Sequence, residues 1–431
     1  MKNMSVFQLV LLMGFGLFFM IGLVVVAIYS NEGNKNNLQT AKVTIWGTLD
    51  GGLIRQVMEG INFKSLNLDV SYRQKSEKTF DSDLAEAIAT GQGPDAILLR
   101  QDSLIPNLKK ISPTPYETYP LRDFKDAFIE EGELFVNAQG VLGVPFLIDP
   151  LVMFWNRDLF SQSGLANPPR FWDELFSLAN QLTLRDTAGN IAQSGAALGA
   201  YDNITNAKEV LSTLFIQSGN SIADWNGPRS AVEVSFLQSP TPPDSVLSFY
   251  TQFSDIRKSV YSWSRALSDS QSMFLSNRLG IYFGFASESK TLKGKSPNLN
   301  FDIAMVPQTR NSSTQGTFGR LYGFAILRSS KNNLASYQAI VALTDKEAIK
   351  NISVLSGLPP VRRDVQVVDA KNPFRATFTQ SALIGKAWLE PGVSASEDIF
   401  KNMIESVLAG FLDSTGAVSE AGQQLRLAYP K

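Results

Sequence analysis

Residues 141–175 read VLGVPFLIDPLVMFWNRDLFSQSGLANPPRFWDEL, and this stretch carries the strongest structural signals in the chain. Its segments 141–146 and 151–155 are short apolar runs rich in β-branched and aromatic residues, which predicts two strands. Between them an Ile-Asp-Pro sequence predicts a chain reversal that carries the carboxylate of Asp149. A loop with paired prolines follows, and apolar residues then recur at helical spacing. The stretch therefore predicts strands followed by a helix, as in an α/β protein.

This order of motifs resembles a segment of the extracellular solute-binding proteins of sugar-type ABC transporters, the maltose-binding-protein-like group. In that family a strand crosses from the first lobe to the second and continues as a tyrosine-asparagine-lysine-aspartate turn. A proline loop then leads into a helix that opens tryptophan-glutamate-glutamate. Here the turn is WNRD at residues 155–158, and the helix opens with FWDEL at residues 171–175. The resemblance extends from about residue 43 to the C-terminus.

Three further motifs carry the resemblance. Residues 93–99 hold the family's Gly-Pro-Asp pattern followed by an apolar strand. Residues 274–284 resemble its Phe…Gly-Lys-Ala-Ala-Met motif with a different lysine-glycine order, and residues 356–363 match its late Gly-x-x-Pro-x-Arg loop. The resemblance implies an α/β, two-lobed, periplasmic-binding-protein-like fold of type II. It also implies a binding protein rather than an enzyme, and no cofactor.

Composition excludes several classes of function. The chain of 431 residues contains no cysteine and no histidine, which removes disulfides, thiolate nucleophiles, Ser-His-Asp triads and the commonest metal ligand. Its length predicts two or three domains. The net charge is −1, from 39 basic and 40 acidic residues, and no basic block stands out. We therefore expect no metal site and no nucleic-acid partner.

Residues 6–29 form an almost uninterrupted apolar run, long enough to cross the ~30 Å hydrocarbon core of a membrane. We favour an uncleaved transmembrane anchor that places everything after Tyr29 outside the cell, in the extracellular or periplasmic space. The alternative is a cleavable signal peptide, because a weak small-residue site lies at Val25-x-Ala27. The polar, asparagine-rich segment that follows suits a flexible tether.

We expect the folded part of the chain to form two lobes joined by at least two crossing segments, near residues 146–151 and 301–308. At both places a predicted strand interrupts the alternation of strands and helices and fits neither half of the chain alone, which is the reason for expecting a crossing there. The expected divisions are 1–29 for the anchor or signal segment, 30–41 for the tether, 42–146 with 307–344 for lobe 1, and 147–306 with 345–431 for lobe 2. The ligand is expected in the cleft between the lobes, and its binding is expected to close them by a hinge motion.

Candidate ligand-binding residues lie at predicted strand ends and polar turns or follow from the resemblance. An aromatic face suits the apolar C–H face of a pyranose, while carboxylates and amides bind its hydroxyls. The candidates are Trp46, Thr48, Asp50, Arg100, Asp102, Asp149, Trp155, Tyr201, Asn203, Gln217, Tyr282, Tyr322 and Trp388. Taken singly, each aromatic residue is more often part of the core than a ligand contact. Trp46, Trp155 and Tyr201 are the exceptions, because they lie at strand ends or in polar turns.

The resemblance implies a bacterial, membrane-tethered extracellular protein that captures a mono- or oligosaccharide and delivers it to an ABC transporter permease. One alternative is a sensor or adhesion module with the same bilobal fold and no transporter. Another is a glycan-processing enzyme that uses paired carboxylates, drawn from Asp50, Asp95, Asp102 and Asp149. Nothing in the sequence brings a specific pair to the required separation, so we do not expect catalysis.

Overall fold

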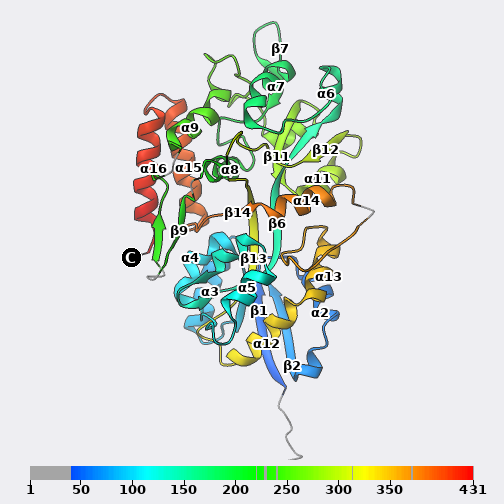
Figure 1. Cartoon of the computed structure of the whole chain (residues 1–431), viewed down its shortest axis with the longest axis vertical. Helices are drawn as coiled ribbons and strands as arrows, with labels where there is room; N and C mark the ends of the chain where they lie inside the picture. Colours follow the sequence, from blue (N-terminus) through cyan, green and yellow to red (C-terminus); the bar gives the residue numbers. More distant parts are fainter. Residues whose placement is uncertain are drawn as a thin grey trace, which may run out of the picture.

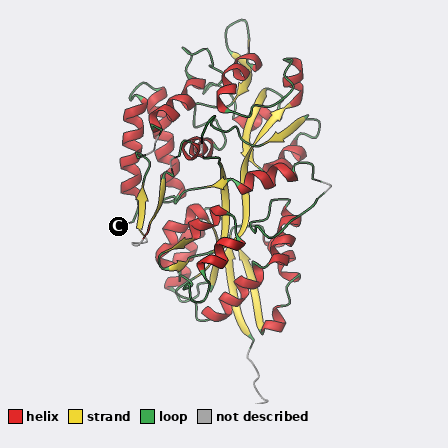
Figure 2. Ribbon diagram, in the orientation of Figure 1, coloured by secondary structure: helices red, strands yellow, loops and turns green. Residues whose placement is uncertain are grey.

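The computed structural model describes residues 40–219, 221–227, 231–238, 241–312, 314–369 and 372–430. These residues fold into two α/β lobes, drawn one above the other in Figure 1. Helices flank the strands of both lobes (Figure 2). A ten-stranded sheet runs through both lobes in the order β2-β1-β3-β13-β6-β11-β8-β7, with β12 also paired to β6 and β14 to β13. The predicted two-lobed α/β fold is confirmed.

The predicted membrane segment, residues 6–29, and nearly all of the predicted tether, residues 30–41, lie outside the described residues. Within the described part of the chain, none of the helices is long and apolar enough to cross a membrane. The N-terminal anchor therefore stays a prediction.

The first lobe is built on parallel strands. β1 (Ala41–Gly47) lies between β2 (Leu68–Gln74) and β3 (Ala96–Arg100) and pairs in parallel with both. Helices α2 (Gly51–Glu59) and α3 (Phe80–Ala89) form the connections between these strands. The resulting β-α-β-α-β order directs the carboxyl ends of β1 and β3 toward the second lobe.

The first crossing between the lobes is one continuous strand, β6 (Val144–Asn156). The prediction of two strands with a chain reversal at Asp149 is wrong. Residues 144–150 pair with β13, and residues 151–156 pair with β11 and β12 in the second lobe. Pro150, which has no N–H to donate, lies at the boundary between these ladders, where it interrupts neither of them.

Two further crossings follow later in the chain. β13 (Thr317–Ile326) runs antiparallel to β6 and β3 and reaches from the second lobe into the first. The predicted crossing at residues 301–308 is wrong, because β12 (Phe301–Ala304) pairs with the second-lobe end of β6. β14 (Gly385–Lys386) pairs in parallel with the start of β13 and leads back to the second lobe. These two strands lie beside β6 in the centre of Figure 1.

In the second lobe β11 (Leu279–Phe285) pairs with β6 on one side and with β8 (Ile191–Ala196) on the other. Helix α8 (Ala207–Gln217) is buried along nearly its whole length between β13, α9 (Pro243–Thr251) and α15 (Val393–Leu408).

The other strands are β4 (Val136–Asn137), β5 (Gly140–Val141), β7 (Leu184–Arg185), β9 (Ala223–Asn226) and β10 (Ala231–Val234). The other α-helices are α4 (Leu104–Asn107), α5 (Leu121–Ala127), α6 (Arg157–Gln162), α7 (Leu175–Leu182), α10 (Ser270–Leu275), α11 (Glu288–Lys295), α12 (Asn333–Leu343), α13 (Lys346–Ser356), α14 (Arg375–Leu383) and α16 (Ser414–Ala428). The 3₁₀-helices are η1 (Phe63–Leu66), η2 (Gln101–Ser103), η3 (Leu108–Lys110), η4 (Glu130–Phe135), η5 (Trp172–Glu174) and η7 (Gln252–Ser254).

Two clusters of buried apolar side chains stabilise this arrangement. One fills the first lobe and continues along β6 into the second lobe through Phe154 and Tyr282, and the other surrounds α8 and α15. Helix α13 packs against α2 of the first lobe, although the predicted division assigns residues 345–431 to lobe 2. The lobe boundaries stay a prediction, and this contact favours a first lobe that extends to the end of α13.

Candidate ligand-binding site between the lobes

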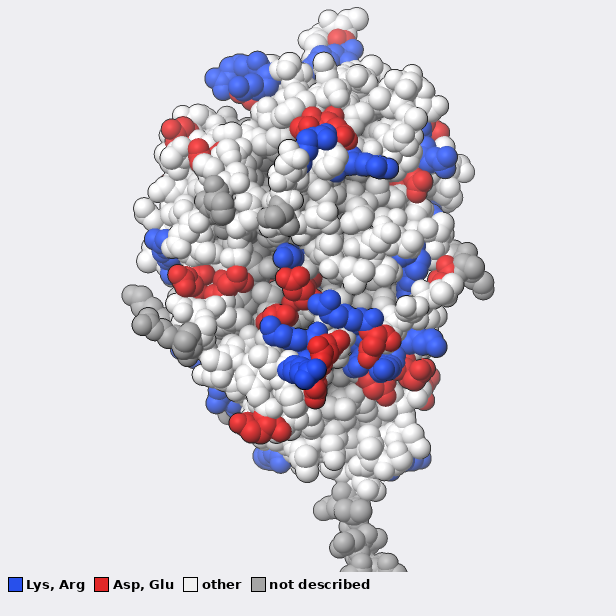
Figure 3. All heavy atoms as spheres, in the orientation of Figure 1, with Lys and Arg blue, Asp and Glu red and all other residues white. Residues whose placement is uncertain are grey.

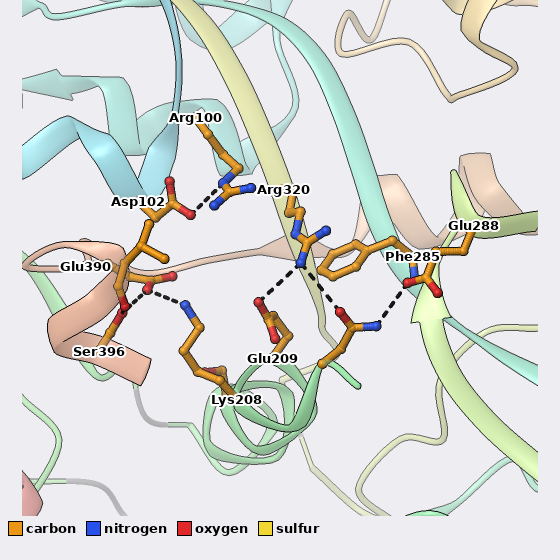
Figure 4. A network of polar contacts seen from close by, with 12 residues as sticks. Arg100, Asp102, Lys208, Glu209, Phe285, Glu288, Arg320, Glu390 and Ser396 are labelled. Atoms are coloured by element: carbon orange, nitrogen blue, oxygen red, sulfur yellow. Dashed lines mark hydrogen bonds and ion pairs between the residues drawn. The ribbon is translucent and has the colours of Figure 1, made fainter. Parts of the chain in front are cut away.

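The carboxyl end of β3 carries a charged group on the first-lobe side of the site. Arg100 is the last residue of β3, and its Nε donates to Asp102 Oδ2 at 2.5 Å. Another nitrogen of the same guanidinium lies 3.0 Å from Glu77 Oε1. Burial lowers the pKa of Arg100, but the two carboxylates outweigh burial and raise the pKa, so the arginine stays charged. Figure 4 shows Arg100 and Asp102 side by side.

An ion pair between Lys208 at the start of α8 and Glu390 after β14 lies on the second-lobe side of the site. Lys208 Nζ lies 2.5 Å from Glu390 Oε2, and only 4% and 0% of these side chains are exposed. Ser396 Oγ donates to the same carboxylate oxygen. Burial lowers the pKa of Lys208, but Glu390, Glu209 and Asp102 raise it above its usual value. Because Asp102 belongs to the first lobe, its charge acts across the boundary between the lobes.

The crossing strands contribute Arg320 and Asp149, which face each other in the register of β13 and β6. The Arg320 guanidinium lies 3.6 Å from the ring centroid of Phe285 and 3.5 Å from Glu209 Oε1. Figure 4 shows it directed from β13 toward α8. A cation over an aromatic face is attracted by the ring quadrupole, so Phe285 helps to hold the guanidinium in this direction.

Asp149 and Tyr322 add an acceptor and a donor beside these charges. Asp149 Oδ1 accepts the backbone N–H of Ser287 at 3.0 Å. Burial raises the pKa of Asp149 to about 6, although Ser287 and Arg320 oppose the rise. Tyr322 is opposite Arg100 in the register, and burial raises the pKa of Tyr322 despite the nearby arginines. At pH 7 the phenol is therefore neutral and able to donate, whereas Asp149 is mostly a carboxylate.

Charges of both signs alternate across this region. Figure 3 shows acidic and basic side chains mixed across the middle of the molecule's visible face. Each of the three cations Arg100, Lys208 and Arg320 contacts a carboxylate, so the region has no large field of a single sign. Directed donors and acceptors of this kind suit a ligand with many hydroxyl groups. Among the described residues, no group of acidic side chains is arranged to hold a metal ion.

The structure brings part of the predicted set together. Arg100 ends β3 and Asp102 follows it in η2, while Tyr322 lies within β13 and Asp149 within the neighbouring strand β6. Tyr201 lies on the second-lobe side, partly buried, and burial followed by nearby carboxylates, Glu397 first, raises the pKa of Tyr201. These five residues are the sequence-based candidates that the fold places around the junction of the lobes.

Three candidates lie at the carboxyl end of β1. The Asp50 carboxylate accepts the backbone N–H of Leu53 at 2.8 Å and so caps α2. Trp46 is buried, its indole N–H has no partner among the described residues, and Lys75 Nζ lies 3.8 Å from its ring centroid. Thr48 is partly exposed in the turn that follows. Asp50 is engaged at the start of α2, and the predicted contributions of Trp46, Thr48 and Asp50 to binding stay predictions.

Asn203 and Gln217 are used inside the second lobe. The Asn203 side chain accepts from Trp263 Nε1 at 2.9 Å and donates to two loop carbonyls. Gln217 is fully buried, accepts from Trp172 Nε1 at 2.7 Å and donates to the carbonyls of Pro307 and Gly316. Both side chains fasten loops to the lobe, and their hydrogen bonds leave little capacity for a ligand.

The remaining aromatic candidates pack against elements of the second lobe. Tyr282 and Trp388 are fully buried, and Trp388 stacks on Phe400 with ring centroids 5.8 Å apart. Trp155 lies at the second-lobe end of β6, where its ring centroid is 5.1 Å from that of Phe160. Their predicted roles as sugar platforms remain predictions, and these positions argue against them.

Sequence reasoning missed Lys208, Glu209, Arg320 and Glu390. Lys208 and Glu209 are two charged residues at the start of an otherwise apolar, buried helix, and that pattern could have identified them. Arg320 is likewise a charged residue within an apolar strand. Glu390 has no such local signal, because its partner lies 182 positions earlier in the chain.

The sequence has recognisable relatives. A family model described as bacterial extracellular solute-binding protein matches residues 61–376. Proteins of Brucella abortus (strain 2308) and Brucella suis biovar 1 (strain 1330), both named as binding proteins, are 24% identical to the chain over 343 residues. Each match covers 76% of this chain and 77% of the relative.

Solved structures share the fold at low identity. A cyclo/maltodextrin-binding protein complexed with maltotetraose superposes with a TM-score of 0.73 at 16% identity, covering 90% of this chain and 96% of that chain. A cyclic alpha-maltosyl-1,6-maltose binding protein from Arthrobacter globiformis gives 0.71 at 16% identity, covering 90% and 99%. An extracellular solute-binding protein from Staphylococcus aureus in complex with maltose gives 0.69 at 14% identity, covering 90% and 97%. Because the family model matches most of this chain, the chain belongs to the bacterial extracellular solute-binding proteins and is not an enzyme.

Proposed function

We propose that the chain binds a carbohydrate at the junction of its two lobes. The observation that carries this proposal is the convergence of Arg100 and Asp102 from the first lobe, Lys208 and Glu209 from the second, and Arg320 from a crossing strand. Each group is held by a partner, so its donor and acceptor atoms have fixed directions. Fixed donors and acceptors select among hydroxyl groups of different stereochemistry.

Two tyrosines provide the aromatic part of the proposed site. Tyr322 lies on β13 opposite Arg100 and close in sequence to Arg320, and Tyr201 lies near the start of α8. A phenol ring packs on the apolar face of a sugar while its hydroxyl donates to the ligand. The similar proteins whose structures contain maltotetraose or maltose support a saccharide as the ligand class.

Calorimetry of the full chain with maltotetraose, maltose, mannobiose and tagatose tests the ligand class. We expect saturable binding of at least one of them. Arg320→Ala should weaken that binding by about 10-fold or more, because a hydrogen bond from a charged donor contributes about 1.5–3 kcal/mol.

Arg257→Ala is the matched control, since Arg257 is 84% exposed in the second lobe and pairs with Asp255. Its affinity should equal that of the parent chain. Absence of binding to all four saccharides, together with saturable binding of an amino acid or a peptide, would refute the carbohydrate proposal.

We also propose that residues 6–29 hold the protein at the membrane and that it delivers its ligand to an ABC transporter permease. The length of the apolar run supports the anchor, and membership of the family supports extracellular binding. Fractionation of cells that express the full chain, or the chain without residues 2–29, tests the anchor. The full chain should resist a carbonate wash of the membranes, and release of both forms would contradict the proposal.

A further inference from the structure

Glu131 is a buried carboxyl group at the place where the lobes are joined. It belongs to η4, and only 4% of its surface is exposed. Neither carboxyl oxygen has a hydrogen-bond partner among the described residues. Because most buried polar groups in folded proteins are hydrogen-bonded, a carboxyl without a partner requires an explanation.

The crossing strands enclose this carboxyl. A Cβ atom added at Gly319 of β13 would overlap with Glu131 Oε2, and one added at Gly385 of β14 would lie 2.7 Å from the same oxygen. The position of that second Cβ atom is also 3.0 Å from Ile148 Cδ1 of β6. Helix η4 contacts all three crossing strands. The Glu131 side chain therefore occupies a space that exists because two crossing strands have glycine there.

No opposite charge offsets the burial of Glu131. The charged groups on the elements packed around it are Arg122, Asp123, Lys125, Asp126, Glu130, Glu133, Asp149, Arg320, Arg375 and Lys386. None of them has a hydrogen bond or ion pair with Glu131, and Lys125, Arg320, Arg375 and Lys386 each bind another acceptor. Burial alone raises the pKa of Glu131 to about 8, so the carboxyl is protonated at neutral pH.

We propose that the Glu131 side chain forms a protonation-dependent contact that restrains the hinge between the lobes. In its neutral form the carboxyl stays between Gly319 and Gly385 and holds η4 against the crossing strands. The ionised form is costly to bury, so it moves toward water and releases this contact. The crossing strands then rotate more freely, and the lobes change their relative orientation over a wider range.

Distances between two spin labels, one in each lobe, test the proposal on the full chain without any ligand. The chain contains no cysteine, so two introduced cysteines are the only thiols that the spin label can modify. Lys350 on α13 and Gln162 on α6 are exposed and lie in different lobes. We expect a narrow distribution of distances below pH 7 that broadens with a midpoint near pH 8, the pH at which Glu131 ionises.

Glu131→Gln keeps the shape of the side chain and removes its ionisation, so its distribution should stay narrow over the whole pH range. Glu131→Leu serves the same purpose if the glutamine variant does not fold. Glu133→Gln is the matched control, because Glu133 lies in the same 3₁₀-helix and pairs with Lys125 at the surface. It should broaden as the parent does. An unchanged distribution in the parent at high pH, or the same broadening in Glu131→Gln, overturns the proposal whatever the ligand proves to be.

Discussion

Glu390 and Glu131 are both buried, but their surroundings are opposite. Glu390 lies 2.5 Å from Lys208 Nζ and accepts from Ser396, whereas Glu131 has no partner among the described residues. Burial raises the pKa of Glu390 and the ammonium of Lys208 opposes the rise, but nothing opposes the rise at Glu131. The comparison shows that a neighbouring ammonium opposes the effect of burial on a carboxyl, whereas a carboxyl without such a partner experiences the full effect. In the proposed ligand site the ion pair fixes the direction of the Lys208 side chain, and in the proposed hinge contact the proton lets Glu131 pack closely without a charge.

The largest effect is expected when the paired glutamate loses its partner. Lys208→Met should lower the free energy of unfolding by about 3–5 kcal/mol, because Glu390 is then left buried without a counter-charge. Urea unfolding at pH 7 measures this loss. Lys401→Met is the control, since its partner Asp202 is 60% exposed, and it should lose less than about 1 kcal/mol.

The double variant Lys208→Met with Glu390→Leu sharpens the same prediction. Removing both members leaves no unpaired charge, so most of the lost stability should return. A double variant as unstable as Lys208→Met would show that the loss came from packing around the lysine stem and not from the charge.

The unpaired glutamate should instead make stability depend on pH. The pKa of Glu131 is about 8 in the folded chain against a usual 4.5, so the folded state binds one more proton between these values. Its contribution to stability is fully present below pH 4.5 and is lost as the pH rises through 8. The parent chain should lose about 2 kcal/mol between pH 6 and 8 relative to Glu131→Gln. Urea unfolding at several pH values measures the difference, and parallel curves for the two proteins would contradict it.

The sequence predicts the fold where local signals agree with distant pairing. The strand and helix order of the first lobe follows from local patterns, and so does the α/β class. The Ile-Asp-Pro sequence misleads because an aspartate-proline pair favours turns in isolation. What keeps Asp149 and Pro150 extended is pairing with β13 and β11, whose residues lie more than 100 positions away.

The site is predictable only where it follows a strand end. Arg100 and Asp102 come directly after a recognisable strand, so their place at the edge of the sheet follows from the sequence. The pairing of Lys208 with Glu390 spans 182 positions and depends on how β14 returns to the second lobe. Trp388 is completely buried, although the charged residues Lys386 and Glu390 two positions away on either side suggest an exposed segment.

A smaller effect is expected from filling the space that Glu131 occupies. Gly319→Ala places a methyl group against the Glu131 carboxyl, and the flexible end of that side chain can shift to relieve the overlap. We therefore expect a loss of about 1 kcal/mol, at the low end of the cost of overpacking. Gly227→Ala is the control, because an added Cβ there meets nothing within 4 Å.

Combining Gly319→Ala with Glu131→Ala tests whether the two positions share this space. The alanine at position 319 should then have almost no effect on the free energy of unfolding, because its obstacle has been removed. Equal losses in both backgrounds would place the constraint on Gly319 in the backbone instead of at Glu131.

The smallest effect is expected from the exposed pair beside the buried carboxyl. Lys386 Nζ lies 3.3 Å from Glu130 Oε1, with 33% and 61% of these side chains exposed, and this pair joins the same two elements, η4 and β14. Water screens the pair, so a double-mutant cycle with alanine at both positions should give a coupling energy of about 0.5 kcal/mol that decreases at high salt. A coupling of more than about 2 kcal/mol would mean that surface charge holds η4 to the crossing strand. In that case the hinge contact would depend on Lys386 and Glu130, and its pH dependence would no longer follow the protonation of Glu131.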